Sequence, residues 1–377
     1  MDKSVKKRPL RVCILTNIPA PYRLPVFESL GQYVNLTVFY CKDSSSERQW
    51  TIDIGSENVQ NDILTSLKLP FVSKYFTYNP TLRSILLNEL FDVYIAGENF
   101  DTASSVITLQ KAAQRQKKPF IIWSEAIDTQ YASGNIVSNQ YRKCLYRKAD
   151  YFLAYSEMAS TFLKHRKVPM HKIKRGYQIV PDEQLRPPTK NKKQLGFADK
   201  IVLLYLGYFE PRKGLDLLIT TFKGIPCENC CLVLVGDGPQ KQDLQSLASE
   251  DSRIHFMPYS EGVEKSNWLH AADLFVLPTQ HDPWGLVVNE AMMAGLPIIT
   301  TQAAAVSEII DENGFIIPPN DPSALRQALE TLIHQSDLRL KFGERSQKII
   351  KKYDVALATS AFLDVINHTQ QMDITTV

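Results

Sequence analysis

The sequence predicts an α/β protein built from two doubly wound parallel-sheet domains, and three observations carry this prediction. Short apolar runs that are typical of buried strands alternate with helical patterns along the chain. Residues 181–198 are rich in proline and charge and poor in apolar side chains, as domain boundaries are. The alternation then restarts, and a chain of 377 residues is long enough for two hydrophobic cores.

These observations divide the chain into four segments. We expect an N-terminal domain over residues 1–180, a linker over 181–198 and a second domain over 199–355. Residues 356–377 then form a last helix and a loose tail. In the first domain, the pattern predicts strands at 10–15, 36–40, 91–96, 119–123 and 150–155. Helices are predicted after Arg23, passing through Phe27 and Leu30 towards Gln32, and at 81–91, 103–114, 138–148 and 157–166. Between them, residues 42–64 form a polar loop region that contains Trp50 and has no assigned function.

The second half repeats the alternation. Strands are predicted at 201–206, 231–235, 254–257, 274–278, 298–300 and 314–318, and helices at 215–223, 240–248, 261–271, from about Leu286 to Gly295, and at 304–310, 321–334 and 337–354. The composition is that of an ordinary globular enzyme, and a net charge of +3 is too small to indicate nucleic-acid binding.

The stretch TQHDPWGLVVNEAMMAGLP, residues 279–297, carries the strongest functional signal. It connects two predicted parallel strands, so its first loop lies at the carboxyl edge of a sheet, where ligands bind in open α/β folds. The backbone N–H groups of Gly285 and Leu286 open a helix and offer a seat for a phosphate. Asp282 and Glu290 flank that seat, and their carboxylates can accept hydrogen bonds from sugar hydroxyls. The residues therefore predict a sugar-nucleotide site; the plainer alternative is a helix start with an acidic cap and a solvated Glu290.

The spacing of the two acids resembles the E-x7-E signature of the retaining GT-B glycosyltransferases of family 4, with Asp282 in the first acidic position. The resemblance implies a GT-B architecture, in which two Rossmann-like domains face each other across a cleft and the C-terminal helix crosses back to the first domain. It implies transfer of a sugar from a nucleotide-sugar donor with retention of configuration, without a metal and without a further cofactor. Asp282 would hold the sugar and Glu290 the ribose.

Three further elements of the second half resemble this family. In the loop 207–214, Lys213 matches the lysine of the G-R-x4-K-G element that holds the donor diphosphate. Tyr208 stands where the arginine usually is, so we expect Arg212 to supply the missing charge. Gly236 belongs to a GDGP turn, which either shapes the site or simply connects a strand to a helix. Tyr259 either stacks on the nucleobase or packs as an ordinary side chain.

On the acceptor side, two residues of the first domain are candidates. Glu125 follows a strand at the position where many family members carry a histidine, and it contacts either a sugar or caps the next helix. Arg23 ends the loop PAPYR, in which prolines replace the glycines usual for the family. This loop forms either a wall of the acceptor site or a simple turn.

Basic side chains gather between residues 142 and 175, and they are Arg142, Lys143, Arg147, Lys148, Lys164, His165, Arg166, Lys167, Lys172, Lys174 and Arg175. They form either solvated helix faces or a surface that meets anionic lipids, as a lipid-linked sugar acceptor would require. The apolar run of the N-terminus is too short for a signal peptide, so we expect a cytoplasmic protein that associates peripherally with the membrane.

Other functions were weighed against this one. A dinucleotide oxidoreductase would need G-x-G-x-x-G after its first strand, and that loop contains no glycine. A sugar-nucleotide epimerase or a phosphorylase shares the architecture, and a non-catalytic sugar-nucleotide binder differs in lacking turnover. Cys227, Cys230 and Cys231 have no partner motif that would complete a zinc site. Glycosyl transfer in cell-envelope polysaccharide or glycolipid assembly remains the favoured function.

Overall fold

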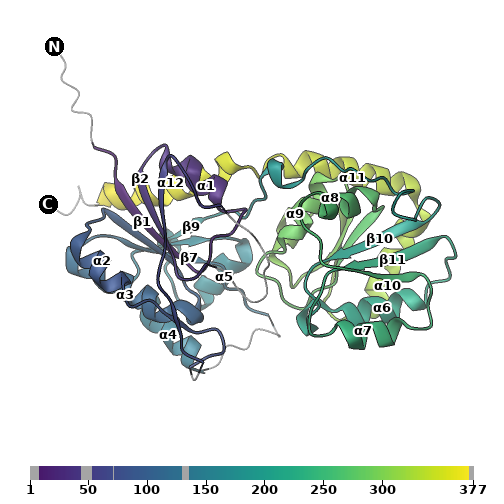
Figure 1. The fold of residues 1–377 in the computed structure, drawn as a ribbon, viewed down its shortest axis with the longest axis horizontal. Helices are drawn as coiled ribbons and strands as arrows, with labels where there is room; N and C mark the ends of the chain where they lie inside the picture. Colours follow the sequence, from purple (N-terminus) through teal and green to yellow (C-terminus); the bar gives the residue numbers. More distant parts are fainter. Residues whose placement is uncertain (1–7, 44–52, 71, 130–135, 373–377) are drawn as a thin grey trace, which may run out of the picture. The chain divides into compact units, whose positions relative to one another are not determined.

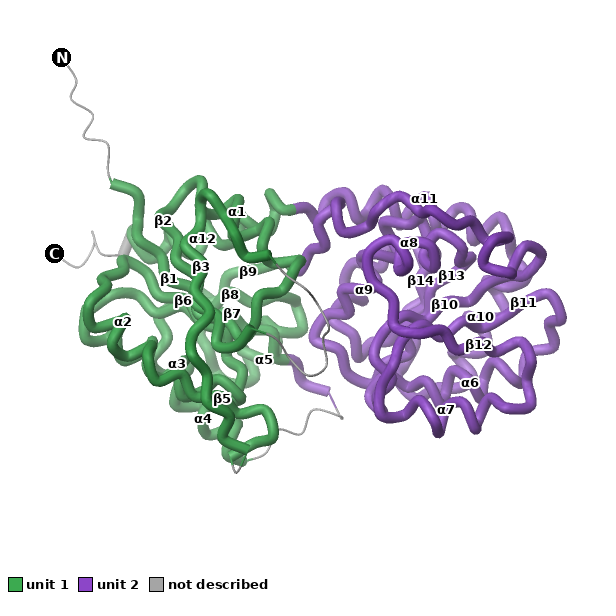
Figure 2. The backbone as a smooth tube through the Cα atoms, in the orientation of Figure 1, with its two compact units in different colours: residues 1–126, 134–177, 355–377 green, residues 127–133, 178–354 purple. Residues whose placement is uncertain are grey.

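The structure is a computed structural model, and it describes residues 8–43, 53–70, 72–129 and 136–372. The chain forms two compact units, which Figure 2 distinguishes by colour. Unit 1 comprises residues 1–126, 134–177 and 355–377, and unit 2 comprises residues 127–133 and 178–354. Each unit is an α/β body with its own sheet (Figure 1).

Unit 1 is built on a parallel sheet with the strand order β3-β2-β1-β6-β7-β8-β9. Its strands are β1 (Arg11–Thr16), β2 (Asn35–Tyr40), β3 (Val59–Ile63), β6 (Val93–Gly97), β7 (Phe120–Ser124), β8 (Tyr151–Ala154) and β9 (Ile173–Arg175), and β4 (Leu67–Lys68) and β5 (Thr77–Tyr78) form a separate antiparallel pair. Its α-helices are α1 (Leu24–Gly31), α2 (Leu82–Asn88), α3 (Ala103–Gln116), α4 (Ile136–Tyr146), α5 (Glu157–His165) and α12 (Val355–Met372).

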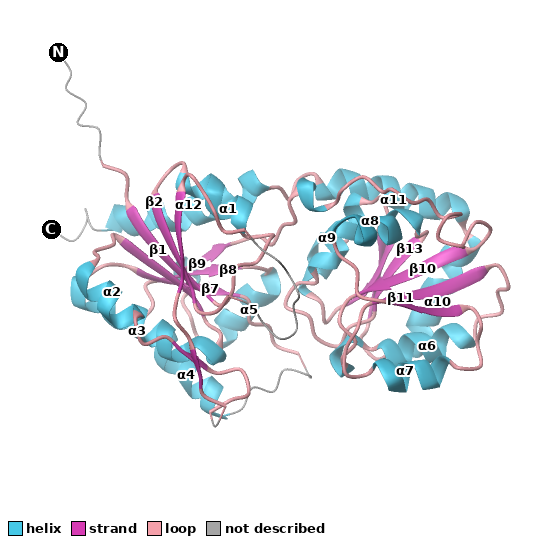
Figure 3. Cartoon of the chain, viewed as in Figure 1, coloured by secondary structure: helices cyan, strands magenta, loops and turns pink. Residues whose placement is uncertain are grey.

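Helices cover both faces of this sheet, with α1 and α12 on one face and α2, α3, α4 and α5 on the other (Figure 3). The central strands are therefore buried on both sides, which explains their continuous apolar sequences. Phe362 of α12 lies edge-on to Phe27 of α1 and to Trp123 of β7, with ring centroids 6.5 and 5.0 Å apart. The last helix of the chain is thus part of the core of unit 1.

Unit 2 has the strand order β12-β11-β10-β13-β14-β15, again parallel. The strands are β10 (Ile201–Leu206), β11 (Cys230–Val235), β12 (Ile254–Met257), β13 (Leu274–Leu277), β14 (Ile298–Thr301) and β15 (Gly314–Ile317). The α-helices are α6 (Leu215–Lys223), α7 (Lys241–Ala248), α8 (Gly262–Ala271), α9 (Leu286–Met293), α10 (Pro322–His334) and α11 (Ser336–Ile350). Helices α8, α9 and α11 cover one face and α6, α7 and α10 the other (Figure 1). Counted within the unit, the order is 3-2-1-4-5-6, that of a dinucleotide-binding fold.

The structure differs from the sequence prediction in local places. Residues 42–64 were expected to be loop, but β3 lies within them and pairs with β2 in parallel. Its sequence VQNDI has one buried residue, Val59, because it is an edge strand, and so it lacks the apolar run that identifies a central strand. Trp50 lies outside the described residues. The expected helix at 304–310 is a 3₁₀ turn, Ala305–Ile309.

Residues 181–198 are not a separate linker, because the structure places them in unit 2. The backbone N–H groups of Thr189 and Lys190 donate to the side-chain oxygen of Asn267 at 2.7 and 3.0 Å. Lys192 forms an ion pair with Asp273. Backbone hydrogen bonds and the side chain of Lys192 thus attach this segment to unit 2. Residues 127–129, which were assigned to the first domain, also belong to unit 2.

Candidate functional site

The order of strands in unit 2 reverses between β10 and β13, which are neighbours in the sheet. Connections to the strands on either side leave in opposite directions at this point, so the loops after β10 and β13 diverge and leave room for a ligand. Lys213 ends the loop after β10, and Asp282 lies in the loop after β13. The fold therefore brings together two residues that are 69 positions apart in the chain.

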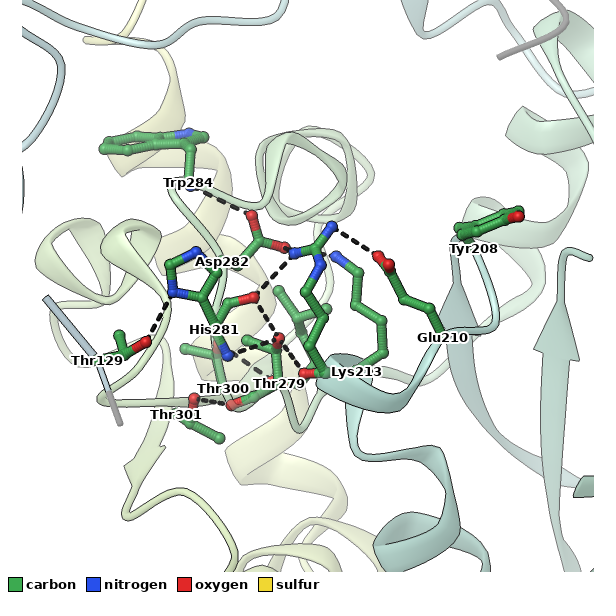
Figure 4. Close-up of polar contacts among 12 residues, drawn as sticks. Thr129, Tyr208, Glu210, Lys213, Thr279, His281, Asp282, Trp284, Thr300 and Thr301 are labelled. Carbon is green, nitrogen blue, oxygen red and sulfur yellow. Dashed lines mark hydrogen bonds and ion pairs between the residues drawn. The ribbon is translucent and has the colours of Figure 1, made fainter. Parts of the chain in front are cut away.

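Lys213 and Asp282 form a buried ion pair, with Nζ 2.6 Å from Oδ2. Their side chains are only 12% and 11% exposed. The other carboxylate oxygen accepts a hydrogen bond from the backbone N–H of Trp284 at 3.2 Å, as Figure 4 shows. Both charges are thus held in place before any ligand arrives.

Opposing effects act on the pKa of Asp282. Burial alone would raise it, but the charges of Lys213 and Arg212 and the N–H group of Trp284 lower it further than burial raises it. The net result is a pKa below the ordinary value of an aspartate. Asp282 is therefore a carboxylate at neutral pH, able to accept hydrogen bonds from hydroxyl groups.

Arg212 lies beside this pair but is held by other partners. Its guanidinium forms an ion pair with Glu210 at 2.6 Å and donates to the backbone oxygen of His281 at 2.8 Å. Its distance to Asp282 is 3.9 Å. Arg212 thus adds positive charge to the site. Its ion pair with Glu210 and its hydrogen bond to His281 hold the guanidinium between the two loops.

The two loops are also joined through their backbones. The carbonyl oxygen of Arg212 accepts hydrogen bonds from Thr279 Oγ1 at 2.8 Å and from the N–H of Gln280 at 2.7 Å. Gly285 precedes α9 with a φ of +96°, and a Cβ atom there would lie 2.9 Å from Leu277 Cδ2. A side chain at this position would be strained and crowded, so glycine allows the loop to turn into the helix whose first residue is Leu286.

Glu290 lies in α9 and is 7% exposed. Its Oε1 is 2.5 Å from Nζ of Lys265, a residue of α8 that the sequence analysis did not identify. Lys265 follows no motif, and only the packing of α8 beside α9 brings it to Glu290. The one signal in the sequence is that this lysine precedes a run of residues that are mostly buried, where a charged side chain needs a partner. Each predicted donor-binding acid therefore has a lysine partner.

The remaining donor-side candidates lie further out. Tyr259 is 41% exposed, and its hydroxyl donates to Glu261 at 3.3 Å. Tyr208 lies beyond Glu210 from Asp282 in Figure 4 and is also exposed. Gly236 has a φ of +153°, and a Cβ atom there would lie 1.9 Å from the backbone oxygen of Gly207. Gly236 is thus required by the close approach of two loops.

His281 is a second residue that the sequence analysis did not select. Its Nδ1 lies 2.7 Å from Thr129 Oγ1. Burial and then the charge of Arg212 lower its pKa below the ordinary value, and Asp282 only partly opposes this shift. His281 is therefore neutral at pH 7. Within the described ranges, no group of three His, Cys, Asp or Glu side chains is arranged to hold a metal ion.

In unit 1, the structure brings Arg23 and Glu125 together, with NH2 of the arginine 3.6 Å from Oε2 of the glutamate. They lie near the carboxyl ends of β1 and β7, and the strand order of unit 1 reverses between β1 and β6. The two acceptor-side candidates are thus part of one cluster at the switch point of their own sheet.

The basic segment 142–175 divides into paired and exposed side chains. Arg142 pairs with Glu98, Lys164 with Glu157 and Lys174 with Asp364, at 3.8, 3.2 and 3.5 Å. The exposed members are Lys143, Arg147, Lys148, His165 and Lys167. The segment is therefore only in part an exposed positive surface. In the described part of the chain, no helix combines the length and apolarity that crossing a membrane requires.

Solved structures with the same architecture establish the fold class. The crystal structure of HepE from Anabaena in complex with UDP aligns over 95% of this chain and 100% of that one, with a TM-score of 0.76 and 16% identity. WaaG, a glycosyltransferase involved in lipopolysaccharide biosynthesis, aligns over 94% of this chain and 99% of that one, with a TM-score of 0.69 and 17% identity. The prediction of a GT-B fold with two Rossmann-like domains is therefore confirmed.

Sequence comparisons find similarity over part of the chain, and the matching family model lies within unit 2. The family model described as Glycosyl transferases group 1 matches residues 188–349. The sulfoquinovosyl transferase SQD2 of Arabidopsis thaliana is 31% identical over 170 residues, which cover 44% of this chain and 33% of that protein. The lipopolysaccharide core biosynthesis glycosyltransferase LpsE of Rhizobium meliloti is 27% identical over 175 residues, 45% of this chain and 50% of its own. The matches thus span a third to a half of these relatives.

Proposed function

We propose that this protein is a retaining glycosyltransferase that moves a sugar from a nucleotide-sugar donor to an acceptor hydroxyl. The observation that carries the proposal is the buried Lys213–Asp282 pair at the switch point of unit 2, beside the N-terminus of α9. A cation and helical N–H groups next to a fixed carboxylate suit the two ends of a sugar diphosphate. The family match to the same residues supports this reading.

In the proposed mechanism, the bond between the anomeric carbon and the diphosphate breaks while positive charge develops on the sugar ring. Lys213, with the added charge of Arg212 and the N–H groups at Gly285 and Leu286, stabilises the departing diphosphate. Asp282 orients the sugar through its hydroxyls, and Glu290 binds the ribose. The acceptor hydroxyl attacks from the side that the diphosphate leaves, and the leaving phosphate takes its proton.

The donor must compete with two internal ion pairs, those of Lys213 with Asp282 and of Lys265 with Glu290. Each lysine keeps its carboxylate ionised and in one orientation before the donor binds. The diphosphate then offers Lys213 a stronger anionic partner, and Asp282 turns its free lone pairs to the sugar. These pairs therefore prepare the site for a ligand that is both anionic and rich in hydroxyl groups.

We further propose a role in the synthesis of cell-envelope polysaccharide or glycolipid, with a sugar or lipid-linked sugar as acceptor and no cofactor or metal. The names of the relatives support this role, because LpsE is a lipopolysaccharide enzyme and SQD2 a sulfoquinovosyl transferase. Exposed Lys143, Arg147, Lys148 and Lys167 offer a contact to anionic lipids at the cytoplasmic face of a membrane.

A thermal-shift panel of UDP-, GDP-, ADP- and CMP-sugars tests the donor site, and UDP-glucose comes first because HepE has been solved with it. At about 100 times its dissociation constant, the right donor adds about 2.7 kcal/mol of stability. Lys213→Ala and Glu290→Ala should each abolish the shift. Lys190→Ala removes an exposed ion pair with Glu264 in the same unit and should leave the shift unchanged.

Product analysis then separates transfer from binding alone. An active enzyme releases the nucleoside diphosphate only when the acceptor is present, and it joins the sugar with the configuration it had in the donor. A donor-dependent shift without product would identify a non-catalytic binder, and an inverted product would contradict the retaining mechanism.

A further inference from the structure

A cavity at the switch point of unit 1 contains an unusual surplus of hydrogen-bond donors. It measures about 370 Å³ with its open mouth. Its lining includes Thr16 and Asn17 after β1, Arg23 before α1, Trp123 of β7, and Glu125 and Tyr155 after β7 and β8. All of these residues belong to unit 1.

Arg23 is the charge at the centre of this cavity. Its side chain is 12% exposed, and its guanidinium carbon lies 4.7 Å from the ring centroid of Trp123. One terminal nitrogen donates to Thr16 Oγ1 at 2.8 Å and to Asn17 Oδ1 at 3.4 Å. Stacking and these two bonds fix the plane of the guanidinium, so its other donors keep a constant direction.

Three buried donors of the cavity wall have no acceptor among the described residues. They are Arg23 Nε, the indole N–H of Trp123 and the hydroxyl proton of Tyr155, whose oxygen faces Arg23, a group that can only donate. A buried donor without a partner costs about 1–3 kcal/mol. Burial raises the pKa of Tyr155 well above its ordinary value, although Arg23 acts against the shift, so the hydroxyl keeps its proton. The cavity therefore lacks an acceptor.

The two carboxylates that line the cavity do not supply this acceptor. Glu98 is buried and already receives hydrogen bonds from Ser124, from the backbone of Ala126 and from Tyr146, besides its ion pair with Arg142. Glu125 is 43% exposed, and its oxygen stands 3.6 Å from Arg23, beyond hydrogen-bond distance. A carboxylate placed in this way is weakly held and can be displaced.

We propose that this cavity binds the phosphate or carboxylate group of an anionic acceptor, with Arg23 as its main ligand and Glu125 as an internal competitor. An oxyanion offers several lone pairs to donors that otherwise have no acceptor. A planar guanidinium can bind it through two nitrogens. Pro19 and Pro21 lack backbone N–H groups, so in this loop the arginine side chain supplies the donors. That the anion is the acceptor rests on the proposed function; the oxyanion site itself does not.

The test measures binding of inorganic phosphate and of acetate to the full chain by calorimetry and thermal shift, at constant ionic strength with chloride. A Lys213→Gln background removes the predicted diphosphate site of unit 2. In this background, Arg23→Gln should weaken phosphate binding about tenfold or more, because a charge-assisted hydrogen-bond pair is lost. Glu125→Gln should strengthen it about fivefold, because the internal competitor loses its charge.

Two tyrosines provide a matched pair that does not depend on the folding of an arginine variant. Tyr155→Phe removes a hydroxyl whose proton has no acceptor among the described residues, so the melting temperature should change little while the affinity for phosphate falls severalfold. Tyr40→Phe removes a hydroxyl that donates to Asn61 at 2.9 Å in the same unit. This control should lower the melting temperature and leave the affinity for phosphate unchanged.

The proposal is overturned if Lys213→Gln alone removes all phosphate and acetate binding, or if the affinity is the same in the Arg23 and Glu125 variants. It is also overturned if Tyr155→Phe only destabilises the protein. Whether phosphate or acetate binds more tightly identifies the anionic group of the acceptor. If the unmodified chain binds no nucleotide-sugar, the proposed function is wrong. The oxyanion site is not affected by that result.

Discussion

Replacing Lys213 by methionine tests the electrostatic reasoning about unit 2 most directly. Methionine keeps much of the length of the side chain but leaves the buried carboxylate of Asp282 without the cation 2.6 Å away. What remains is Arg212 at 3.9 Å and one N–H bond from Trp284. Removing one partner of a buried pair costs about 3–5 kcal/mol. For a unit of this size, that corresponds to a melting temperature lower by about 6–20 °C.

The direction of the pKa shift of Asp282 determines how the stabilisation by this ion pair depends on pH. The pKa of Asp282 is lowered in the folded protein, so the pair stabilises the fold fully above about pH 3.8, the ordinary value. The stabilisation is lost as the pH falls through the lower, folded-state pKa. The difference in stability between the wild type and Lys213→Met should therefore be largest near pH 7 and shrink in acid.

Calorimetric melting across this pH range, with Asp282→Asn and the double variant, completes the experiment. If the cost comes from an uncompensated charge, the double variant should be within about 1 kcal/mol of the wild type, far less than the sum of the single changes. Additive losses, or a Lys213→Met loss that does not change with pH, would refute the reasoning.

Four other outcomes are expected. Lys265→Met leaves the buried Glu290 without its lysine and should weaken nucleotide-sugar binding about tenfold by titration, whereas an unchanged affinity would make Lys265 purely structural. Gly285→Ala forces a Cβ to 2.9 Å from Leu277 at a φ of +96° and should cost about 1–3 kcal/mol in urea unfolding. The pKa of His281 is lowered from 6.5 in the folded protein, so by NMR this side chain should titrate at lower pH in the native than in the urea-unfolded chain. The stabilisation that comes from neutral His281 is present above about pH 6.5 and declines as the pH falls. EDTA should leave turnover intact, and strict metal dependence would contradict the proposed mechanism.

Several features could be predicted from the sequence because they depend on local patterns. The central strands have apolar runs that only a doubly covered parallel sheet accounts for, and the end of α9 is marked by Gly295, with a φ of +79°. The edge strand β3 was missed because half-exposed edge strands carry polar residues. The segment 181–198 was mistaken for a linker because its composition does not reveal that Asn267 binds its backbone.

By itself, the sequence determined the α/β class and the two-domain organisation, because hydrophobic periodicity acts over short stretches of chain. The GT-B fold and the common site of Lys213 and Asp282 were implied by the resemblance of their motifs to a known family. The tertiary structure alone decided which charges meet. Lys265 reaches Glu290, and Arg23 lies among donors of Trp123 and Tyr155, only because strand order and helix packing bring distant segments together. Contacts of this kind are set by the sheet's switch points, and no local pattern records them.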